Sequence, residues 1–455
     1  MGRLLFFLIA GTLAAQTKHI HPTIRAAVDA VSEENIAAIL KKLESFETRN
    51  PFSETDHATR GTGAARRWIH DQFQSYSPRL EVSYDTYKVK QKSRIFRDVE
   101  MVNIVAVLPG KLDPERQVIV SGHYDSAHFV YKPREGRGDS QDPPEIDHEK
   151  TVAAAAPGVT DDGSGTAAVL ELARVMSRHE WDNTIVFIAF DGEEYGLVGS
   201  TLYAARAKEE GRKIEAVLNN DIIGSEVDGR GRSDNRTVRV FSADPVDSGS
   251  RQLARYIREV AERYVPSMKV DSIFQRDRFN RGGDHTPFHE LGFAAVRFTT
   301  PSENYANQHT ASDTFANTSP AYTAMVARVN AAALASLAMA PAAPSTTRTV
   351  TSGLSRGRPA PNISRGPAAK AYDARLRWSD SASADLAGYA VVMRSTTAPF
   401  WEKEMYVGKV TEFTLKDVSI DDKIFGVKAI DKDGNESLVS AYVMAGWPAA
   451  VWETY

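Results

Sequence analysis

The sequence has 455 residues, more than one domain of the usual size needs, so we expect two folded units. Its 55 basic and 59 acidic side chains give a formal net charge of -4, which offers no support for a nucleic-acid-binding or membrane-surface protein. The chain contains no cysteine, and this excludes disulfide bonds, a thiol nucleophile and a lipid attached to cysteine.

Residues 1–15 have the pattern of a secretory signal peptide. Arg3 precedes an apolar run over residues 4–10, and the small residues Ala14 and Ala15 stand where a signal peptidase would cut. No later stretch approaches the roughly 20 apolar residues that a membrane-spanning helix needs, so no span is predicted in the mature chain. We therefore expect an exported protein, periplasmic or extracellular.

Residues 16–340 predict one domain in which helices and strands alternate. Helical spacing of apolar residues predicts helices over residues 26–46, 63–73, 165–176, 197–209, 249–264 and 320–339. Short apolar or alternating runs predict strands over residues 82–89, 102–108, 117–121, 185–190, 216–220, 238–242 and 294–299. The polar stretch 127–156 predicts a long loop. This order indicates a three-layer α/β/α domain with a mixed, mainly parallel sheet.

The C-terminal part of the chain has a different pattern. Residues 341–370 are rich in Pro, Ser, Thr, Ala and Gly, which predicts a linker. Residues 371–455 consist of short alternating segments separated by turn residues, which predicts an all-β sandwich. Trp378, the Gly388-Tyr389 pair and the segment KIFGVKAIDKDGNES resemble a fibronectin type III module, a resemblance that speaks to fold alone. We expect this domain to contact a protein or carbohydrate surface.

Two adjacent glutamates follow the apolar strand predicted over residues 185–190. Asp191 and Gly192 end that strand, and Glu193 and Glu194 come directly after them. Open α/β sheets place their chemistry at the carboxyl ends of strands, where one glutamate can hold a cation and the other can move a proton. An isolated pair is more often part of a solvated turn, so this interpretation depends on the other segments.

Five segments of the first domain carry residues suited to metal binding, most of them at a strand end or a helix start. In chain order these residues are His123, Asp125, Asp161, Asp162, Glu193, Glu194, Asp221 and His309. Imidazole and carboxylate ligands together suit zinc, whereas calcium prefers oxygen alone. Structural zinc sites mostly use thiolates, so a site without cysteine favours a catalytic role, in which a bound ion lowers the pKa of water to about 7.

Six segments occur along the chain in the order VIVSGHYDS, APGVTDDGSGTAAVLELARV, AFDGEEYGLVGS, LNNDIIG, GGDHTPF and QHTASDT. They resemble the successive motifs of the di-zinc aminopeptidase family that includes secreted bacterial leucyl aminopeptidases. The resemblance implies two zinc ions bridged by the carboxylate of Asp161. It further implies that His123 and Asp221 complete the ligands of one ion, and that Glu194 and His309 complete those of the other.

The resemblance also implies a general base. Glu193 would take a proton from the water that bridges the ions and return it to the leaving amine. Asp125 lies two residues after His123 and would orient or polarise that imidazole, and Asp313 would act similarly near His309.

Four further residues belong to the same expected site. Asp162 is predicted to cap free backbone N–H groups at the start of the following helix. Asp284 and His285 lie in the motif GGDHTPF and are interpreted as residues that shape the site or the substrate pocket, not as ligands. Tyr305 could donate its phenol to a developing oxyanion.

These residues together predict a secreted aminopeptidase that acts on peptides with a free N-terminus. A carboxypeptidase of the same family would use the same ligands, so the ligand set leaves this alternative open. A glutaminyl cyclase would need only one zinc ion, and the complete set argues against it. A non-catalytic protein that binds through its C-terminal sandwich is the third alternative, although such proteins usually lose ligands and none is lost here.

Overall fold

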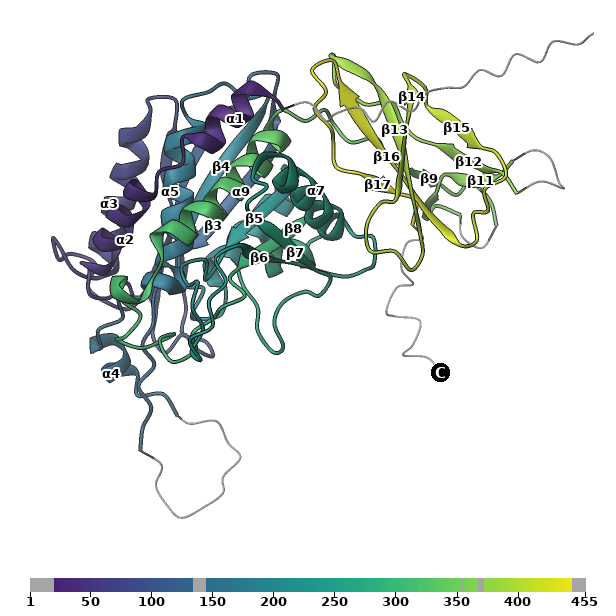
Figure 1. Ribbon diagram of the computed structural model, residues 1–455. Helices are drawn as coiled ribbons and strands as arrows, with labels where there is room; N and C mark the ends of the chain where they lie inside the picture. The colour runs from purple at the N-terminus through teal and green to yellow at the C-terminus, as the bar shows by residue number, and fades with distance from the viewer. Residues whose placement is uncertain (1–19, 134–144, 354–355, 367–371, 444–455) are drawn as a thin grey trace, which may run out of the picture.

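The computed structural model describes residues 20–133, 145–353, 356–366 and 372–443, and the predicted signal peptide over residues 1–15 lies outside them. The described chain forms an α/β domain followed by an all-β domain (Figure 1). Among the described helices, none is long and apolar enough to cross a membrane.

The α/β domain is built on one large sheet, whose described strands follow the order β1-β2-β4-β3-β5-β8-β6-β7. The strands are β1 (Glu81–Val89), β2 (Val99–Leu108), β3 (Asp113–His123), β4 (Asn183–Phe190), β5 (Lys213–Asn220), β6 (Thr237–Ser242), β7 (Lys269–Ile273) and β8 (Ala295–Thr299). Strands β4, β3, β5 and β8 pair in parallel, as do β6 and β7, whereas β2 pairs antiparallel with β1 and β4, and β8 with β6. The predicted mixed sheet is confirmed.

Helices cover both faces of this sheet. The described helices of this domain are α1 (Pro22–Asp29), α2 (Glu33–Glu44), α3 (Gly61–Tyr76), α4 (His148–Ala153), α5 (Ser164–Met176), α6 (Val198–Glu209), α7 (Gly249–Tyr264), α8 (His285–Glu290) and α9 (Pro320–Ala338), of which α4 lies apart from the two helical layers (Figure 1). Alternate residues of the fully buried strand β4 enter two cores. Phe187 belongs to the core that includes residues of α5 and α9, and Ile188 belongs to the core that includes residues of α6 and α8. The three-layer architecture is confirmed.

Three segments differ from the prediction. The helix predicted over residues 26–46 is two helices, because Ser32 caps the N-terminus of α2. Its side chain accepts a hydrogen bond from the backbone N–H of Asn35 at 3.2 Å. The loop predicted over residues 127–156 contains the short helix α4, and its residues 134–144 lie outside the described part of the chain. Strand β7 is short and buries little besides Val270, so its sequence carries a weak pattern.

The C-terminal domain contains two antiparallel sheets that pack face to face. Its described strands are β9 (Thr347–Thr349), β10 (Pro359–Pro361), β11 (Ile363–Arg365), β12 (Ala374–Arg377), β13 (Leu386–Ser395), β14 (Lys403–Gly408), β15 (Glu412–Leu415), β16 (Lys423–Asp431) and β17 (Ser440–Ala441). One sheet has the order β11-β12-β15 and the other β14-β13-β16-β17. Leu376 of the first sheet and Val391 and Val427 of the second share one apolar core, which confirms the predicted sandwich.

The region predicted as a linker, residues 341–370, is partly structured. Strands β9 and β10 pair with each other, and β11 pairs with β12 of the sandwich. Prolines at both ends of β10 interrupt any alternation of polar and apolar residues, so the sequence pattern hides these strands. The sandwich therefore includes residues before position 371.

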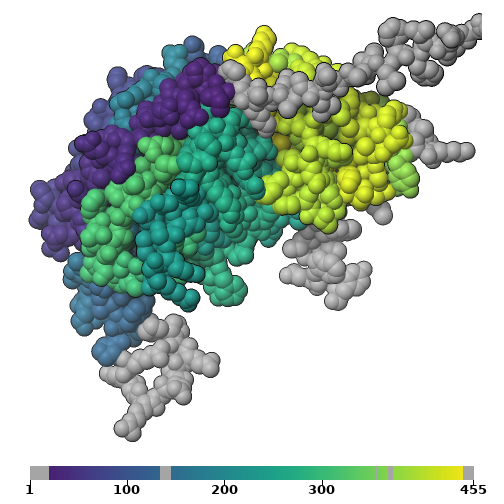
Figure 2. All heavy atoms as spheres, viewed as in Figure 1, coloured from purple at the N-terminus to yellow at the C-terminus, as the bar shows by residue number. Residues whose placement is uncertain are grey.

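The two domains meet along α7. Asp247, just before this helix, accepts hydrogen bonds from Arg255 of α7 at 3.0 Å and from Arg394 of β13 at 2.6 Å. Arg255 also donates to the backbone oxygen of Pro399 at 2.7 Å. In Figure 2 the yellow surface of the sandwich lies directly against the teal surface of the α/β domain. Buried charged groups therefore help to hold the two domains together.

Candidate metal centre

The order of the strands brings the predicted ligands together. Strands β4, β3 and β5 are neighbours and run parallel, so their carboxyl ends meet at one edge of the sheet. His123 is the last residue of β3, Glu193 and Glu194 follow β4, and Asp221 follows β5. The turn before α5 adds Asp161, and the loop between β8 and α9 adds His309. The structure thus gathers the predicted ligands in one place.

Asp161 lies between two imidazoles. One of its carboxylate oxygens is 3.3 Å from Nε2 of His123, and the other is 3.3 Å from Nε2 of His309. Glu194 is 3.0 Å from the same nitrogen of His309, whereas Asp221 is 3.9 Å from Nε2 of His123. A carboxylate with one oxygen toward each histidine has the placement expected of a ligand shared by two ions.

The donor atoms fit zinc. Two sets of side chains have potential ligand atoms within 4.8 Å of one another, namely His123 with Glu193 and Asp221, and His123 with Asp161 and Glu194. Nε2 of His123 and Oε1 of Glu194 are buried without a hydrogen-bond partner among the described residues. Buried polar atoms without partners are unfavourable, and a cation at this point would satisfy them.

The electrostatics of the site also call for positive charge. Burial raises the pKa of Glu194, and its charge in turn raises the pKa of His309 to about 11. Burial alone would raise the pKa of Asp161, but the neighbouring imidazoles of His123 and His309 outweigh it and lower that pKa well below the usual range. The carboxylates therefore draw protons onto the imidazoles, and cations bound here would take the place of those protons.

Asp125 connects the glutamate pair to His123. Its two carboxylate oxygens accept hydrogen bonds from the backbone N–H groups of Glu193 and Glu194, each at 3.2 Å. The same carboxylate lies 3.4 Å from Nδ1 of His123, and this nitrogen lies 3.1 Å from the backbone oxygen of Asp125. Asp125 therefore lies beside the imidazole that it is predicted to orient, and it also fixes the turn that presents the two glutamates.

Asp162 ties three segments together beneath the ligands. It is fully buried and accepts hydrogen bonds from the backbone N–H groups of His123 at 3.1 Å, Gly165 at 2.9 Å and Ile222 at 3.1 Å. The bond to Gly165 is the helix cap that the sequence predicts. A Cβ atom on Gly165 would collide with the Asp162 carboxylate and with the backbone oxygen of Asn220, so only glycine fits there.

Asp313 acts on the backbone and not on His309. Its carboxylate oxygens accept hydrogen bonds from the N–H groups of Thr160 and Asp161, both at 2.9 Å, and no described contact joins it to His309. The predicted pairing of Asp313 with that imidazole is therefore wrong. Burial raises the pKa of Asp313 to about 6. Its place in the structure is to hold the turn that carries Asp161.

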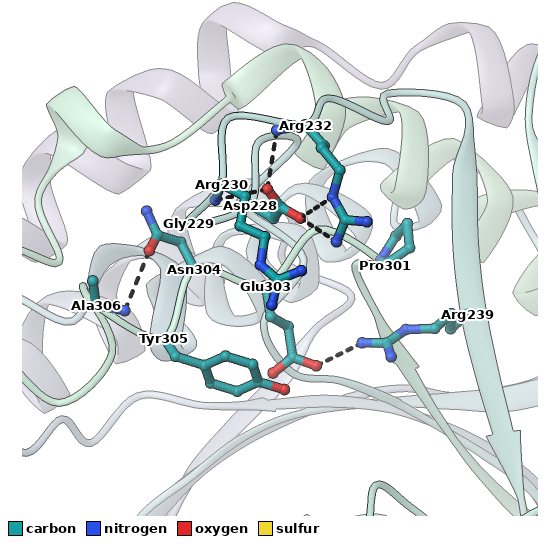
Figure 3. Close-up of a pocket in the computed structure, with 10 residues that line it drawn as sticks. All are labelled: Asp228, Gly229, Arg230, Arg232, Arg239, Pro301, Glu303, Asn304, Tyr305 and Ala306. Atoms are coloured by element: carbon teal, nitrogen blue, oxygen red, sulfur yellow. Dashed lines mark hydrogen bonds and ion pairs between the residues drawn. The ribbon is translucent and has the colours of Figure 1, made fainter.

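The remaining predicted residues lie around the centre. Asp284 is buried just before α8, where burial raises its pKa to about 7. Nε2 of His285 lies 2.9 Å from the backbone oxygen of Arg276, so this histidine supports the surrounding loop. Tyr305 is 64% exposed and lines a neighbouring cavity beside Glu303 (Figure 3), so it lies outside the lining of the metal-centre cavity. This placement argues against the predicted oxyanion role of Tyr305.

Two buried arginines close to the centre were not among the predicted residues. Arg297 of β8 is fully buried and lies 2.8 Å from the carboxylate of Asp221. Arg49 is also buried and donates to the backbone oxygens of Tyr124 at 2.5 Å and Gly158 at 2.7 Å, next to the turn that carries Asp161. The sequence could have indicated a buried ion pair at Arg297, because a charged residue inside the apolar strand AVRFT needs a buried partner.

A cavity of about 430 Å³ opens over the centre, a volume typical of small-ligand sites. Its described lining includes Asp161, Glu193, Glu194, Asp221 and His309. The same lining carries the arginines Arg94, Arg278, Arg281 and Arg297. The cavity therefore joins the candidate metal ligands to a strongly basic wall.

Comparison with known proteins identifies the family. Residues 103–334 match the profile of Peptidase family M28. The chain belongs to this family. A "Probable zinc metalloprotease" of Pyrenophora tritici-repentis is 36% identical over 447 residues, which cover 91% of this M28 chain and 85% of the relative. A second protein so described, from Leptosphaeria maculans, is 36% identical over 445 residues, which cover 91% of this chain and 95% of the relative.

The fold of this M28 chain also occurs in solved structures. The Legionella pneumophila LapA aminopeptidase superposes with a TM-score of 0.51 and 22% sequence identity, over 72% of this chain and 82% of that chain. The family confirms a zinc metallopeptidase, and hence a hydrolase. These curated relatives are fungal, however, and not the bacterial leucyl aminopeptidases that the motifs resemble. The fibronectin type III resemblance of the C-terminal domain stays a prediction.

Proposed function

We propose that this M28 peptidase is an aminopeptidase that holds two zinc ions and removes the N-terminal residue of peptides. The observation that carries the proposal is the Asp161 carboxylate, which directs one oxygen to His123 and the other to His309. Asp221 would complete the first set of ligands and Glu194 the second. Export by the predicted signal peptide is part of the same proposal.

Glu193 is the proton carrier in this proposal. Zinc ions held by these ligands would polarise the scissile carbonyl and lower the pKa of the attacking water. Glu193 lines the cavity, and burial raises the pKa of its carboxyl well above the usual range. A raised pKa suits a group that must accept a proton from water and then release it to the leaving amine near neutral pH. Asp125 keeps Glu193 in position through its backbone N–H.

The aminopeptidase assignment has support from the fold. LapA, the solved neighbour described as an aminopeptidase, shares the α/β architecture of this chain. Carboxypeptidase activity is the second candidate, because Arg278 and Arg281 in the cavity lining could hold the C-terminal carboxylate of a peptide.

Metal content combined with a substrate panel tests the proposal. We expect two zinc ions per chain and release of free amino acids from leucyl and alanyl anilides and from unblocked dipeptides. N-acetylated peptides should resist hydrolysis. Cleavage of N-acetylated peptides with a free C-terminus, together with failure on the anilides, would replace the aminopeptidase assignment by the carboxypeptidase one. Zinc binding without hydrolysis of any of these substrates would favour a binding protein.

A further inference from the structure

The cavity over the metal centre has a wall formed by the loop before α8. Arg278 and Arg281 of this loop line the same cavity as Glu193 and Asp221. A substrate that places its scissile bond at the metal ligands would therefore present adjacent groups to these two guanidinium groups.

Glu303 holds the two arginines in place. Its carboxylate accepts hydrogen bonds from Arg239 at 2.5 Å, from Arg278 at 2.6 Å and from Arg281 at 3.2 Å. Figure 3 shows this carboxylate between Arg239 and the ring of Tyr305, and the guanidinium of Arg281 lies 5.4 Å from the centre of the same ring. Burial would raise the pKa of Glu303, but the arginines outweigh it and keep the group ionised. One carboxylate thus anchors three cations.

The wall consequently carries more positive than negative charge. Apart from Asp221, which belongs to the metal ligands, the described acidic partners of the cavity-lining arginines Arg278, Arg281 and Arg297 are Glu303 and Asp277. Glu303 also pairs with Arg239, which lines the neighbouring cavity. Arg94, also in the cavity lining, is exposed and forms no ion pair with any described residue. Unbalanced guanidinium groups beside a catalytic centre are suited to binding a carboxylate.

We propose that Arg278 and Arg281, with Arg94 nearby in the lining, form a subsite that binds a carboxylate of the substrate next to the scissile bond. This inference rests on the proposed peptidase function and adds the chemical class of the substrate. The carboxylate could be the side chain of an acidic N-terminal residue or the C-terminal carboxylate of a short peptide. Substrates with a cationic N-terminal side chain would be repelled by the same wall.

Matched substrate pairs test the subsite and separate the two sources. Glutamyl and glutaminyl anilides have side chains of the same shape that differ in charge, and so isolate an acidic side chain. Alanyl-alanine and its C-terminal amide isolate the terminal carboxylate. We expect kcat/KM to be at least about tenfold higher for the charged member of one pair, which is the size of one charged hydrogen bond. Equal values within both pairs, with turnover present, would overturn the inference and leave the aminopeptidase proposal intact.

Variants attribute the preference to the arginines. Arg281→Met should reduce the charge preference to near unity, and Arg281→Lys, which keeps the charge without the planar fork, should keep part of it. The matched control is Arg232→Met, because Arg232 lines the neighbouring cavity and pairs with Asp228 at 2.6 Å, so the preference should stay as in the wild type. A preference that survives both Arg281→Met and Arg278→Met would contradict the inference.

A binding measurement tests the subsite without turnover. Glutarate and its monoamide, glutaramate, each offer one carboxylate to zinc, but glutarate carries a second carboxylate that could reach Arg281. Calorimetric titration of the zinc-loaded protein should give about tenfold tighter binding of glutarate, and Arg281→Met should abolish the difference. Equal affinity in the wild type would overturn the subsite. The binding measurement can be made even if the protein cleaves no peptide. The subsite proposal and the aminopeptidase proposal can therefore be rejected independently.

Discussion

The guanidinium of Arg297 lies 2.8 Å from the carboxylate of Asp221, at the edge of the metal centre. Arg297 also contacts Asp277 at 3.0 Å, and all three side chains are buried. In the metal-free protein, Arg297 is therefore the nearest cation that neutralises Asp221. An ion bound by Asp221 would take over part of this task.

This relationship predicts a metal-dependent effect of Arg297→Leu. The substitution leaves buried carboxylates without their cation, so the free energy of unfolding of the metal-free protein should fall by about 3–5 kcal/mol. The loss should be smaller with zinc, because the ion opposes the charge of Asp221. Urea unfolding with and without zinc measures both values. Arg116→Leu is the control, because it removes another buried arginine, which donates to Glu215 at 2.6 Å and is not part of the metal centre. The loss of unfolding free energy in this variant should not depend on zinc. A zinc-independent loss for Arg297→Leu would contradict the prediction.

The two adjacent glutamates should respond differently to the same substitution. Glu193→Gln removes the proposed proton carrier but no proposed ligand, so kcat should fall by about a hundredfold to ten-thousandfold with two zinc ions retained. Glu194→Gln weakens the ligand that lies 3.0 Å from His309, so zinc content should fall along with kcat. Metal analysis and kinetics on one preparation check both. Glu210→Gln, beyond the end of α6, should change neither. The reverse pattern would mean that the two roles are exchanged.

The buried side chain of His285 should make the folding stability depend on pH. Burial lowers its pKa to about 4, against about 6.5 for an exposed histidine. At pH values above 6.5 the side chain is neutral in both states. As the pH falls from 6.5 to 4, the unfolded chain gains a proton that the folded chain does not, so folding stability falls by up to about 3 kcal/mol. His285→Gln should remove this component.

Urea unfolding at several pH values measures that difference. The loss of stability between pH 7 and pH 4.5 should be smaller in His285→Gln than in the wild type. His57→Gln replaces an exposed histidine and should leave the wild-type profile unchanged. Parallel profiles for the wild type and His285→Gln would show that His285 does not contribute.

The sequence predicts those parts of the molecule in which local pattern and final structure agree. Helix α7 begins and ends where its apolar spacing indicates. His123 ends a strand and Asp221 follows one, and the buried runs of both strands are easily recognised. Their convergence follows from a general property of parallel sheets. The basic wall could not be predicted in this way, because Arg278 acquires its role from Glu303, 25 residues away in the chain. The prediction pairs Asp313 with His309 because the two residues are close in the sequence. The sequence does not show that the Asp313 carboxylate instead accepts a hydrogen bond from the backbone N–H of Asp161.

The last prediction concerns the contact between the two domains. Asp247 is the buried carboxylate shared by Arg255 and Arg394, which come from different domains. Asp247→Ala leaves two guanidinium groups buried without this partner, so the free energy of unfolding should fall by about 3–5 kcal/mol. Since this cluster joins the domains, calorimetry should show one unfolding transition in the wild type and two in the variant.

A substitution at the rim of the same contact provides the control. Arg258 lies 4.0 Å from the centre of the Phe400 ring, and its side chain is 37% exposed. Exposed cation–π contacts contribute about 0.5–1 kcal/mol, so Arg258→Ala should shift the transition slightly without dividing it. A single, unshifted transition in Asp247→Ala would show that the buried cluster does not couple the domains. If two transitions appear, the midpoint that zinc raises belongs to the peptidase domain, because an ion that binds only the folded state stabilises the domain that holds it.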